Sequence, residues 1–280
     1  MDMADIKNKR IAVLSPVAWR TPPRAYGAWE TVAGNIAEGL VARGWKNVTL
    51  FATKQSVTSA KLDGWIEKGY EEDKSQVPLV STCLHISKVM QRAGEFDLIH
   101  NNFDYLPLTY APLIKTPMLT TIHGFSEPDI LRVYHDHQDT YYVSISDSDR
   151  DPGLPYVATV YNGIDLSNLT FRPETGDKLV HYGRIHNDKG THLAIEVAKK
   201  SGMDLIIAGI IQDQDYFDNL VKPHINQSSI QFIGPVNPEQ RDALLKEAYA
   251  VLHLNTIPER FGLVMAESMA AGVPVIAMDS

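Results

Sequence analysis

Two short segments of this chain carry charged residues and glycines in a spacing suited to holding a phosphate group. The first, residues 183–190, reads Gly-Arg-Ile-His-Asn-Asp-Lys-Gly. Arg184 offers a planar, permanently charged set of donors, and Lys189 offers a compact point charge, so the two are complementary means of binding phosphate oxygens. Gly183 and Gly190 flank them, and residues without a Cβ let the backbone approach a ligand closely. This segment therefore predicts an anion-binding loop.

The second segment, residues 259–267, reads Glu-Arg-Phe-Gly-Leu-Val-Met-Ala-Glu and opens a stretch with helical spacing. The start of a helix presents free N–H groups and the positive end of its dipole, which favour an anion or sugar hydroxyls. Glu259 is expected in the loop before this helix and Glu267 inside it, where carboxylates can accept hydrogen bonds from hydroxyls. The predicted helix start consists of Phe261, Gly262 and Leu263.

Both segments follow hydrophobic runs that are typical of strands, so both are expected at the carboxyl edge of an α/β sheet, where such sheets bind ligands. Together they suit a group that develops negative charge as its bond breaks, such as a nucleotide diphosphate leaving a sugar. Each segment alone also fits an ordinary solvated loop or a chance pair of glutamates. Their joint occurrence at matching strand ends favours the functional interpretation.

The two motifs resemble those of the retaining glycosyltransferases of family 4. The pattern Gly-Arg-hydrophobic-x-x-x-Lys-Gly is matched by residues 183–190, and the Glu-x7-Glu signature by Glu259 and Glu267. The resemblance extends from Arg10 to the last residue. It implies an α/β fold of two Rossmann-like domains facing a central cleft, in the GT-B arrangement.

The same resemblance implies a role for each residue of the motifs. Arg184 and Lys189 would bind the diphosphate, and Glu267 would bind the ribose hydroxyls. Glu259 would bind the donor sugar, together with the backbone amides of residues 261–263. No metal is expected, since the two cations can neutralise the diphosphate, and no cofactor is expected besides the donor substrate.

The N-terminal half contributes two further candidates. Gly27 lies where the family carries a Gly-Gly pair close to the donor phosphate or acceptor, but Ala28 replaces the second glycine, and a tight turn with φ > 0 explains Gly27 equally well. His123 lies at a predicted strand end, where the family has a histidine near the donor sugar. Neutral imidazole can donate a hydrogen bond to a hydroxyl or a phosphate oxygen, and a structural role is the alternative. Three other histidines are predicted to be structural: His100, His181 and His253.

Strands alternating with helices predict parallel sheets in two domains. A turn-rich stretch near residue 165 divides an acceptor-side domain, residues 1–165, from a nucleotide-sugar donor domain, residues 166–280. Strands are predicted at residues 10–15, 48–52, 96–100, 118–122, 141–145 and 157–161, and then at 179–183, 204–208, 230–233, 251–254 and 273–277. Helices are predicted at residues 29–40, 191–200, 216–225, 238–248 and 263–271.

Composition agrees with this interpretation. A chain of 280 residues exceeds a typical single domain, and 44% hydrophobic with 21% charged residues is ordinary for a soluble protein. A net charge of −8 argues against a nucleic-acid-binding surface. Cys83 is the single cysteine, which excludes an intramolecular disulfide and favours a reducing cytoplasm. Residues 1–10 predict no secretory signal, and no apolar run has the roughly twenty residues that cross a bilayer, which leaves only peripheral membrane contact.

The expected activity is transfer of a hexosyl group from a nucleotide diphosphate sugar to a hydroxyl acceptor, with retention at the anomeric carbon. UDP-hexose is the first choice of donor and GDP-mannose the second. A nucleotide-sugar epimerase or hydrolase, or a catalytically silent donor-binding or scaffold protein, would use the same residues. Because the sequence stops directly after a predicted strand, we expect an incomplete C-terminal domain whose exposed apolar surface favours self-association.

Overall fold

The computed structural model describes residues 3–125, 128–148 and 150–279. The chain forms two compact units, one of Met1–Pro23 with Gly27–Gly163, the other of Arg24–Tyr26 with Ile164–Ser280. The main division thus follows Gly163, where the sequence predicts a division after residue 165.

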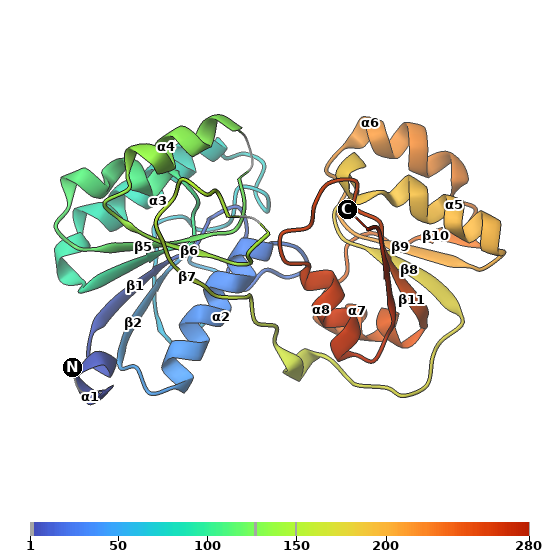
Figure 1. Ribbon diagram of the computed structural model, residues 1–280, viewed down its shortest axis with the longest axis horizontal. Coiled ribbons are helices and arrows are strands. Elements are labelled where there is room, and N and C mark those ends of the chain that lie inside the picture. Colours follow the sequence, from blue (N-terminus) through green and yellow to red (C-terminus); the bar gives the residue numbers. More distant parts are fainter. Residues whose placement is uncertain (1–2, 126–127, 149, 280) are drawn as a thin grey trace. The chain divides into compact units, whose positions relative to one another are not determined.

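The first unit is built on a seven-stranded sheet in the order β3-β2-β1-β4-β5-β6-β7, and every neighbouring pair of strands is parallel (Figure 1). The order reverses between β1 and β4, the topological switch point beside which Rossmann-type sheets bind ligands. The strands are β1 Arg10–Leu14, β2 Asn47–Phe51, β3 Lys61–Asp63, β4 Leu98–Asn101, β5 Met118–Ile122, β6 Tyr141–Ser144 and β7 Tyr156–Thr159. The helices are α1 Met3–Lys7, α2 Ala28–Ala42, α3 Pro78–Gln91 and α4 Leu131–Asp136, with short 3₁₀ turns η1 Ala93–Glu95, η2 Leu106–Leu113 and η3 Pro128–Ile130.

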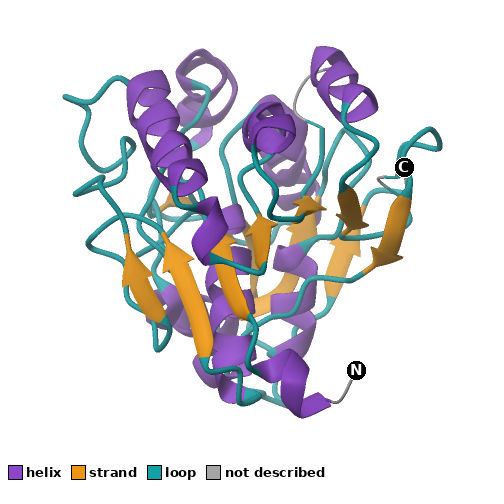
Figure 2. Cartoon of the chain, turned by 90° about the vertical axis from the view of Figure 1, so that its left-hand side faces the viewer, coloured by secondary structure: helices purple, strands orange, loops and turns teal. Residues whose placement is uncertain are grey.

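Helices cover both faces of this sheet, as Figure 2 shows for the unit that faces the viewer. Strand residues alternate between the two faces. In β1, Ile11 and Val13 pack in one core with Ala33 and Ala37 of α2. Ala12 and Leu14 point the other way, into a larger core that contains the buried side of α3 and α4. This double burial explains why the strands are continuous apolar runs.

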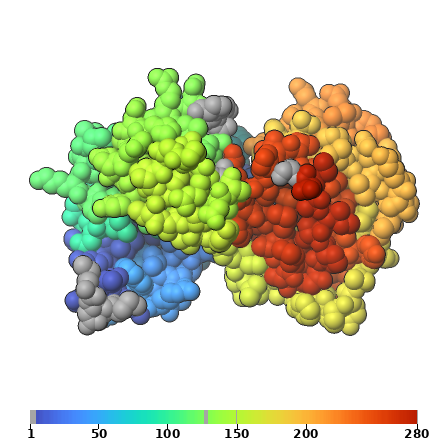
Figure 3. Space-filling model, in the orientation of Figure 1, coloured from blue at the N-terminus to red at the C-terminus, as the bar shows by residue number. Residues whose placement is uncertain are grey.

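The second unit contains a five-stranded parallel sheet in the order β10-β9-β8-β11-β12. Helices α5 and α6 share one core with the sheet, and α7 and α8 share the other. β12 is an edge strand whose residues are exposed or half-buried, and the last described residues lie at the surface of this unit (Figure 3). The strands are β8 Lys178–Tyr182, β9 Leu205–Ala208, β10 Ile230–Phe232, β11 Ala248–His253 and β12 Val275–Ala277. The helices are η4 Leu166–Asn168, η5 Asn187–Lys189, α5 Thr191–Ser201, α6 Gln214–Tyr216, η6 Phe217–Val221, η7 Lys222–His224, α7 Pro238–Lys246 and α8 Leu263–Ala270.

Two predicted helices differ from the structure. The helix predicted at residues 216–225 consists of a short α-helical turn, a π-helical stretch and a 3₁₀ turn, because Pro223 in η7 lacks the N–H that a regular helix requires. The helix predicted at residues 238–248 ends at Lys246, and Ala248 already begins β11. In the described part of the chain, no helix is long and apolar enough to cross a membrane.

Candidate active site

The strand ends β8 and β9 bring two glycines together at the carboxyl edge of the second sheet. Gly183 follows β8 with φ 146°, and Gly209 follows β9 with φ 150°. A Cβ on Gly209 would lie 1.6 Å from the carbonyl oxygen of Gly183, so only glycine fits there. A Cβ on Gly183 would meet no atom within 4 Å. The backbone at Gly183 therefore borders open space, which a ligand can approach closely.

Arg184, the next residue, is held in place by its neighbours. One terminal nitrogen, Nη2, lies 2.9 Å from Oδ2 of Asp188, and the other, Nη1, donates to the side-chain oxygen of Gln212. Burial would raise the pKa of Asp188, but the charge of Arg184 and a hydrogen bond from His186 outweigh it and lower the pKa. The side chain of Arg184 is 25% exposed to solvent. Arg184 is therefore an oriented cation that remains accessible.

Lys189 and Glu259, predicted separately from two motifs, meet in the second unit. Nζ of Lys189 donates to Oε2 of Glu259 at 3.3 Å. The same carboxylate oxygen accepts from Nε2 of His253 at 3.0 Å and from Nδ2 of Asn255 at 2.6 Å. Burial would raise the pKa of Glu259, but the His253 hydrogen bond and the Lys189 charge hold it well below its usual range. Glu259 is thus a fixed, ionised acceptor.

The involvement of His253 corrects its sequence-based interpretation. It is buried in β11, as predicted, but its ring contacts a candidate site residue and is not confined to the core. His253 and Asn255 are two residues apart at the end of β11, so their side chains leave the chain on the same side. That alternation of hydrogen-bonding residues just before Glu259 is the signal that could have identified them. His181 lies buried in its sheet, as predicted, and His100 is half-buried in β4, with Nε2 2.8 Å from Oγ1 of Thr121.

Glu267 lies in α8 and faces the interior of the second unit. Its Oε1 lies 3.0 Å from Nη1 of Arg241 in α7, and its Oε2 accepts from the hydroxyl of Tyr182 at 3.4 Å. Burial raises its pKa, and the charge of Arg241 opposes that rise. Glu267 therefore forms a half-buried ion pair, and its predicted contact with ribose hydroxyls would use the remaining acceptor capacity of the carboxylate.

The start of α8 has the predicted geometry. Gly262 is the N-cap with φ 84°, a left-handed conformation that glycine adopts without strain, and Leu263 is the first helical residue. Phe261, just before the cap, is half-buried. The first N–H groups of a helix have no acceptor within it, so this end can donate to a ligand. The predicted contacts of Phe261, Gly262 and Leu263 with a donor sugar stay predictions.

In the first unit, His123 follows β5 and is 8% exposed. Its ring stacks on Trp29 of α2, with centroids 5.7 Å apart, and its Nε2 lies 3.3 Å from Oδ1 of Asn102. Burial, with a smaller contribution from His100, lowers the pKa of His123 to about 3. The imidazole is therefore neutral near pH 7 and carries one proton.

The position of that proton follows from the amide of Asn102. Its Nδ2 donates to the carbonyl oxygen of His100 at 3.4 Å, so its Oδ1 is the atom that faces His123. An amide oxygen only accepts, so Nε2 of His123 must carry the ring's proton. The other ring nitrogen, Nδ1, is then an acceptor. The expectation that His123 donates to a sugar or phosphate oxygen stays a prediction; with the proton on Nε2, Nδ1 is the nitrogen left for another partner, and it would accept from a hydroxyl.

Gly27 is the N-cap of α2 and has φ 145°. A Cβ there would lie 2.9 Å from Oε2 of Glu30 and 3.0 Å from Cβ of Pro23. Burial raises the pKa of Glu30 to about 7, and its carboxylate accepts from the N–H of Trp19 at 3.2 Å. The backbone conformation and this crowding both require glycine, so the turn accounts for Gly27, and its contact with a donor stays a prediction.

Residues 167–280 match the family model described as "Glycosyl transferases group 1". The glycogen synthase of Mycobacterium tuberculosis (strain H37Rv) is 29% identical over 233 residues, which cover 71% of this chain and 56% of that protein. The chain thus spans little more than half the length of that relative. A glycosyltransferase of Methanocaldococcus jannaschii, named as uncharacterized, is 22% identical over 94% of this chain and 79% of its own length.

Solved structures of other proteins share the fold. HepE from Anabaena, solved in complex with UDP and glucose, has a TM-score of 0.74 at 19% identity and covers 98% of this chain and 81% of its own. Sucrose-phosphate synthase from Thermosynechococcus elongatus has a TM-score of 0.75 at 17% identity, with 96% and 81% covered. These likenesses confirm the predicted class of two Rossmann-like α/β domains of the GT-B type. The central cleft of the GT-B arrangement stays a prediction.

The group 1 match falls on the unit that holds most of the candidate residues. Arg184, Lys189, Glu259 and Glu267 all lie within it, and His123 and Gly27 belong to the other unit. Among the described residues, no three or more His, Cys, Asp or Glu side chains are grouped as metal ligands would be.

Proposed function

We propose that this chain is a retaining glycosyltransferase that moves a hexosyl group from a nucleotide diphosphate sugar to a hydroxyl acceptor. One observation carries the proposal: two cations, Arg184 and Lys189, are oriented by carboxylates at the edge of a Rossmann-like sheet, beside the bare backbone of Gly183. Fixed positive charge at that place stabilises a departing diphosphate. The group 1 match over the same residues supports it.

Each residue has a place in the proposed reaction. The bond between the anomeric carbon and the diphosphate oxygen breaks, and the leaving group's charge is taken up by Arg184 and Lys189. The acceptor oxygen bonds to the same face of the carbon, which retains its configuration, and the acceptor's proton passes to the departing phosphate oxygen. Glu259 and the start of α8 hold the donor sugar, and Glu267 holds the ribose.

His123 contributes to the same reaction from the first unit. Because its neutral ring carries the proton on Nε2, it accepts a hydrogen bond from a sugar hydroxyl and does not add charge. UDP-hexose is the first donor to test, since a solved relative of this fold, HepE, is in complex with UDP-glucose. GDP-mannose is the second.

A panel of nucleotide sugars measured by calorimetry identifies the donor, and transfer to an acceptor library then measures activity. Arg184→Ala should lower the transfer rate by roughly a hundredfold or more, because one charge-assisted contact to the leaving group is lost. Lys200→Ala is the matched control, since this lysine lies on α5 with 80% of its side chain exposed. Near-normal transfer by Arg184→Ala would refute the role of Arg184. Release of free sugar or of an epimer without any acceptor would refute transfer itself.

A further inference from the structure

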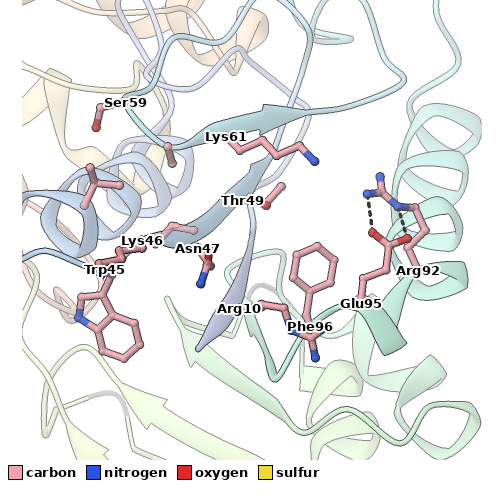
Figure 4. A pocket seen from close by; sticks show the side chains of 13 residues that line it. Arg10, Trp45, Lys46, Asn47, Thr49, Ser59, Lys61, Arg92, Glu95 and Phe96 are labelled. Atoms are coloured by element: carbon pink, nitrogen blue, oxygen red, sulfur yellow. Dashed lines mark hydrogen bonds and ion pairs between the residues drawn. The ribbon is translucent and has the colours of Figure 1, made fainter. Parts of the chain in front are cut away.

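Three buried side-chain atoms in the described part of the chain lack a hydrogen-bond partner: Nε of Arg20, Nδ1 of His85 and Nε of Arg241. None of them lines the pocket of about 330 Å³ at the amino edge of the first sheet, where Arg92 is paired with Glu95 (Figure 4). Arg241 differs from the other two because it contacts a residue predicted to bind the donor: its Nη1 lies 3.0 Å from Oε1 of Glu267. Buried polar atoms usually have a partner, so this exception beside a predicted ligand contact indicates a functional role.

The ion pair of Arg241 and Glu267 is expected to contribute little net stability. The two side chains are only 21% and 14% exposed, so both charges lose most of their hydration when the chain folds. That loss offsets much of the attraction between them, and apolar side chains in such a place are often as stable or more stable. The buried Nε also forgoes a hydrogen bond that it makes with water in the unfolded chain. A role in holding Glu267 therefore explains Arg241 better than a role in folding.

Two elements of the second unit restrain the two carboxylate oxygens of Glu267. Arg241 in α7 faces Oε1, and the hydroxyl of Tyr182 at the end of β8 lies 3.4 Å from Oε2. The single proton of that hydroxyl is shared, because the carbonyl oxygen of Val264 lies 3.0 Å away and Oγ of Ser268 3.2 Å away. Arg241 carries a permanent charge and is therefore the main restraint on the carboxylate.

The carboxylate of Glu267 keeps acceptor capacity for two more donors. An ionised carboxylate offers about four acceptor positions, two on each oxygen. Arg241 and Tyr182 use one position on each oxygen, so one on each oxygen is left. Ribose carries two neighbouring hydroxyls, and each can donate to one of these positions. A protonated carboxyl has fewer acceptor positions, and its hydrogen bonds are not strengthened by charge.

We propose that Arg241 is a positioning residue for the donor: it keeps Glu267 ionised and oriented, so that the carboxylate binds both ribose hydroxyls of a nucleotide diphosphate sugar. This inference rests on the proposed function, and it makes Arg241 the residue that sets selectivity for ribose over deoxyribose.

The charge of Arg241 decides when Glu267 is ionised. Burial raises the pKa of Glu267, and the charge of Arg241 and a hydrogen bond from Tyr182 oppose that rise. Among the described residues, these are the charged and titratable side chains that face the carboxylate. Without Arg241, the carboxyl keeps its proton to a higher pH, since burial penalises the charged form. Binding of a ribonucleotide should then weaken as the pH falls.

Calorimetric titration of the full chain with ribonucleoside diphosphates and their 2′-deoxy counterparts tests the proposal, with uracil, guanine and adenine as bases. The best ribonucleotide should bind about tenfold or more tightly than its 2′-deoxy form, because the latter lacks one charge-assisted hydrogen bond. In Arg241→Met this ratio should fall to about two- or threefold at pH 6 and recover in part at pH 8.5, where Glu267 regains its charge. Arg241→Lys, which keeps the charge, should keep most of the ratio at both pH values.

Arg172→Met is the matched control for loss of a half-buried ion pair in the same unit. Arg172 pairs at 2.7 Å with Asp242, the residue after Arg241, and the two side chains are 22% and 20% exposed. Its loss should disturb the second unit to a similar extent but leave the ratio unchanged. Hydrogen exchange of amides in β8 and β11 checks that each variant is folded. In a chain that carries Glu267→Gln, which has no charge to hold, adding Arg241→Met should not lower the ratio further.

Several results would overturn the proposal. One is an unchanged ratio in Arg241→Met, and another is a fall of equal size at pH 6 and pH 8.5, since Arg241 would then act by packing alone. An equal fall in Arg172→Met, or a further fall when Arg241→Met is added to Glu267→Gln, also overturns it. If the unaltered chain binds ribo and deoxy forms equally, the predicted ribose contact of Glu267 is wrong, and the inference fails with it. If no nucleoside diphosphate binds at all, the proposed function itself fails.

Discussion

The candidate residues at the carboxyl edges of the two sheets differ in charge: those of the second unit are charged and those of the first are neutral. In the second unit, Arg184 and Lys189 are ionised and oriented by carboxylates. Their side chains are 25% and 23% exposed to solvent. In the first unit, His123 and Asn102 are neutral and almost fully buried. The same sheet architecture thus supports a charged pair, Arg184 and Lys189, at one edge (the charged edge) and an uncharged pair, His123 and Asn102, at the other (the neutral edge).

The difference follows from how much water each edge keeps. A cation that is partly solvated and paired loses little of its hydration, so Arg184 and Lys189 can stay charged. A buried imidazole without a carboxylate partner loses its proton, because burial penalises the charged form. The charged edge is suited to an anionic leaving group, and the neutral edge to hydroxyl groups. This division is what the proposed transfer reaction requires.

The largest expected effect compares the two glycines at the charged edge. Gly183 and Gly209 both have φ near 150°, so alanine carries a similar backbone strain at each, about 1–3 kcal/mol. Gly209→Ala additionally drives a Cβ into the carbonyl oxygen of Gly183, and we expect a total loss of stability above about 4 kcal/mol. Gly183→Ala meets open space and should instead weaken donor binding. Hydrogen exchange of the β8 amides measures the first effect, and calorimetry with UDP-glucose the second.

These two variants separate a structural glycine from a ligand-facing one. If Gly183→Ala bound donor normally while its fold was intact, the open space beside Gly183 would not be the donor site. If Gly209→Ala were as stable as Gly183→Ala, the close approach of the two backbones would be absent in solution.

A smaller effect is expected from Lys189→Ala. Glu259 has a pKa held below its ordinary value of 4.5, so its ionised form stabilises the folded chain above that pH. This contribution is lost as the pH falls from 4.5 through the lowered pKa of the folded state. Removing Lys189 should therefore cost about 1–3 kcal/mol at pH 7, and the difference from the unaltered chain should shrink toward pH 3.

The measurement must report the second unit alone. All four tryptophans, Trp19, Trp29, Trp45 and Trp65, belong to the first unit, so tryptophan fluorescence follows that unit. Hydrogen exchange of amides in β8 and β11 follows the second. Lys200→Ala, an exposed partner of Glu196, should change stability by no more than about 0.5 kcal/mol. A pH-independent loss for Lys189→Ala would contradict the electrostatic coupling with Glu259.

The sequence predicts the central strands of both sheets well, because these are buried on both faces and therefore appear as apolar runs. β5 is predicted with its observed bounds, Met118–Ile122. β3 is not predicted, since it has only three residues and none of them is buried. α3 is not predicted either, because it buries the polar Ser81, Thr82 and His85 and exposes Leu79, which obscures the helical spacing of apolar residues.

The candidate site is predicted in its residue types but not in its contacts. Motif spacing indicates Lys189 and Glu259 individually, yet their ion pair depends on how the loops after β8 and β11 fold toward each other. The reach of His253 from a strand into that pair is a tertiary contact with no local signature beyond its alternation with Asn255. The neutrality of His123 depends on burial by distant segments such as α2, which a linear pattern does not contain.

The smallest expected effect tests the neutral edge through Asn102. Asn102→Asp replaces the amide that accepts from His123 with a carboxylate, which stabilises the imidazolium form. The pKa of His123 should rise from about 3 toward or above its ordinary value of 6.5. Once protonated, the ring donates from both nitrogens, so it no longer accepts from a hydroxyl. Transfer should fall by about tenfold at pH 5.5, because loss of the hydrogen bond that His123 accepts costs roughly 1–2 kcal/mol. It should recover in part at pH 8, where the ring is less protonated.

Imidazole ¹⁵N NMR of the full chain measures this directly, because the two ring nitrogens have different shifts when one carries the proton. The unaltered chain should show His123 with its proton on Nε2 throughout the range from pH 5 to 8. Asn102→Leu is the matched variant: it removes the acceptor without adding charge, so it should disturb the tautomer but not raise the pKa. A fall in activity of equal size and equal pH dependence in both variants would mean that Asn102 acts only by packing. If the proton of His123 were found on Nδ1 in the unaltered chain, that nitrogen could not accept from a hydroxyl. The proposed role of His123 at the neutral edge would then be wrong.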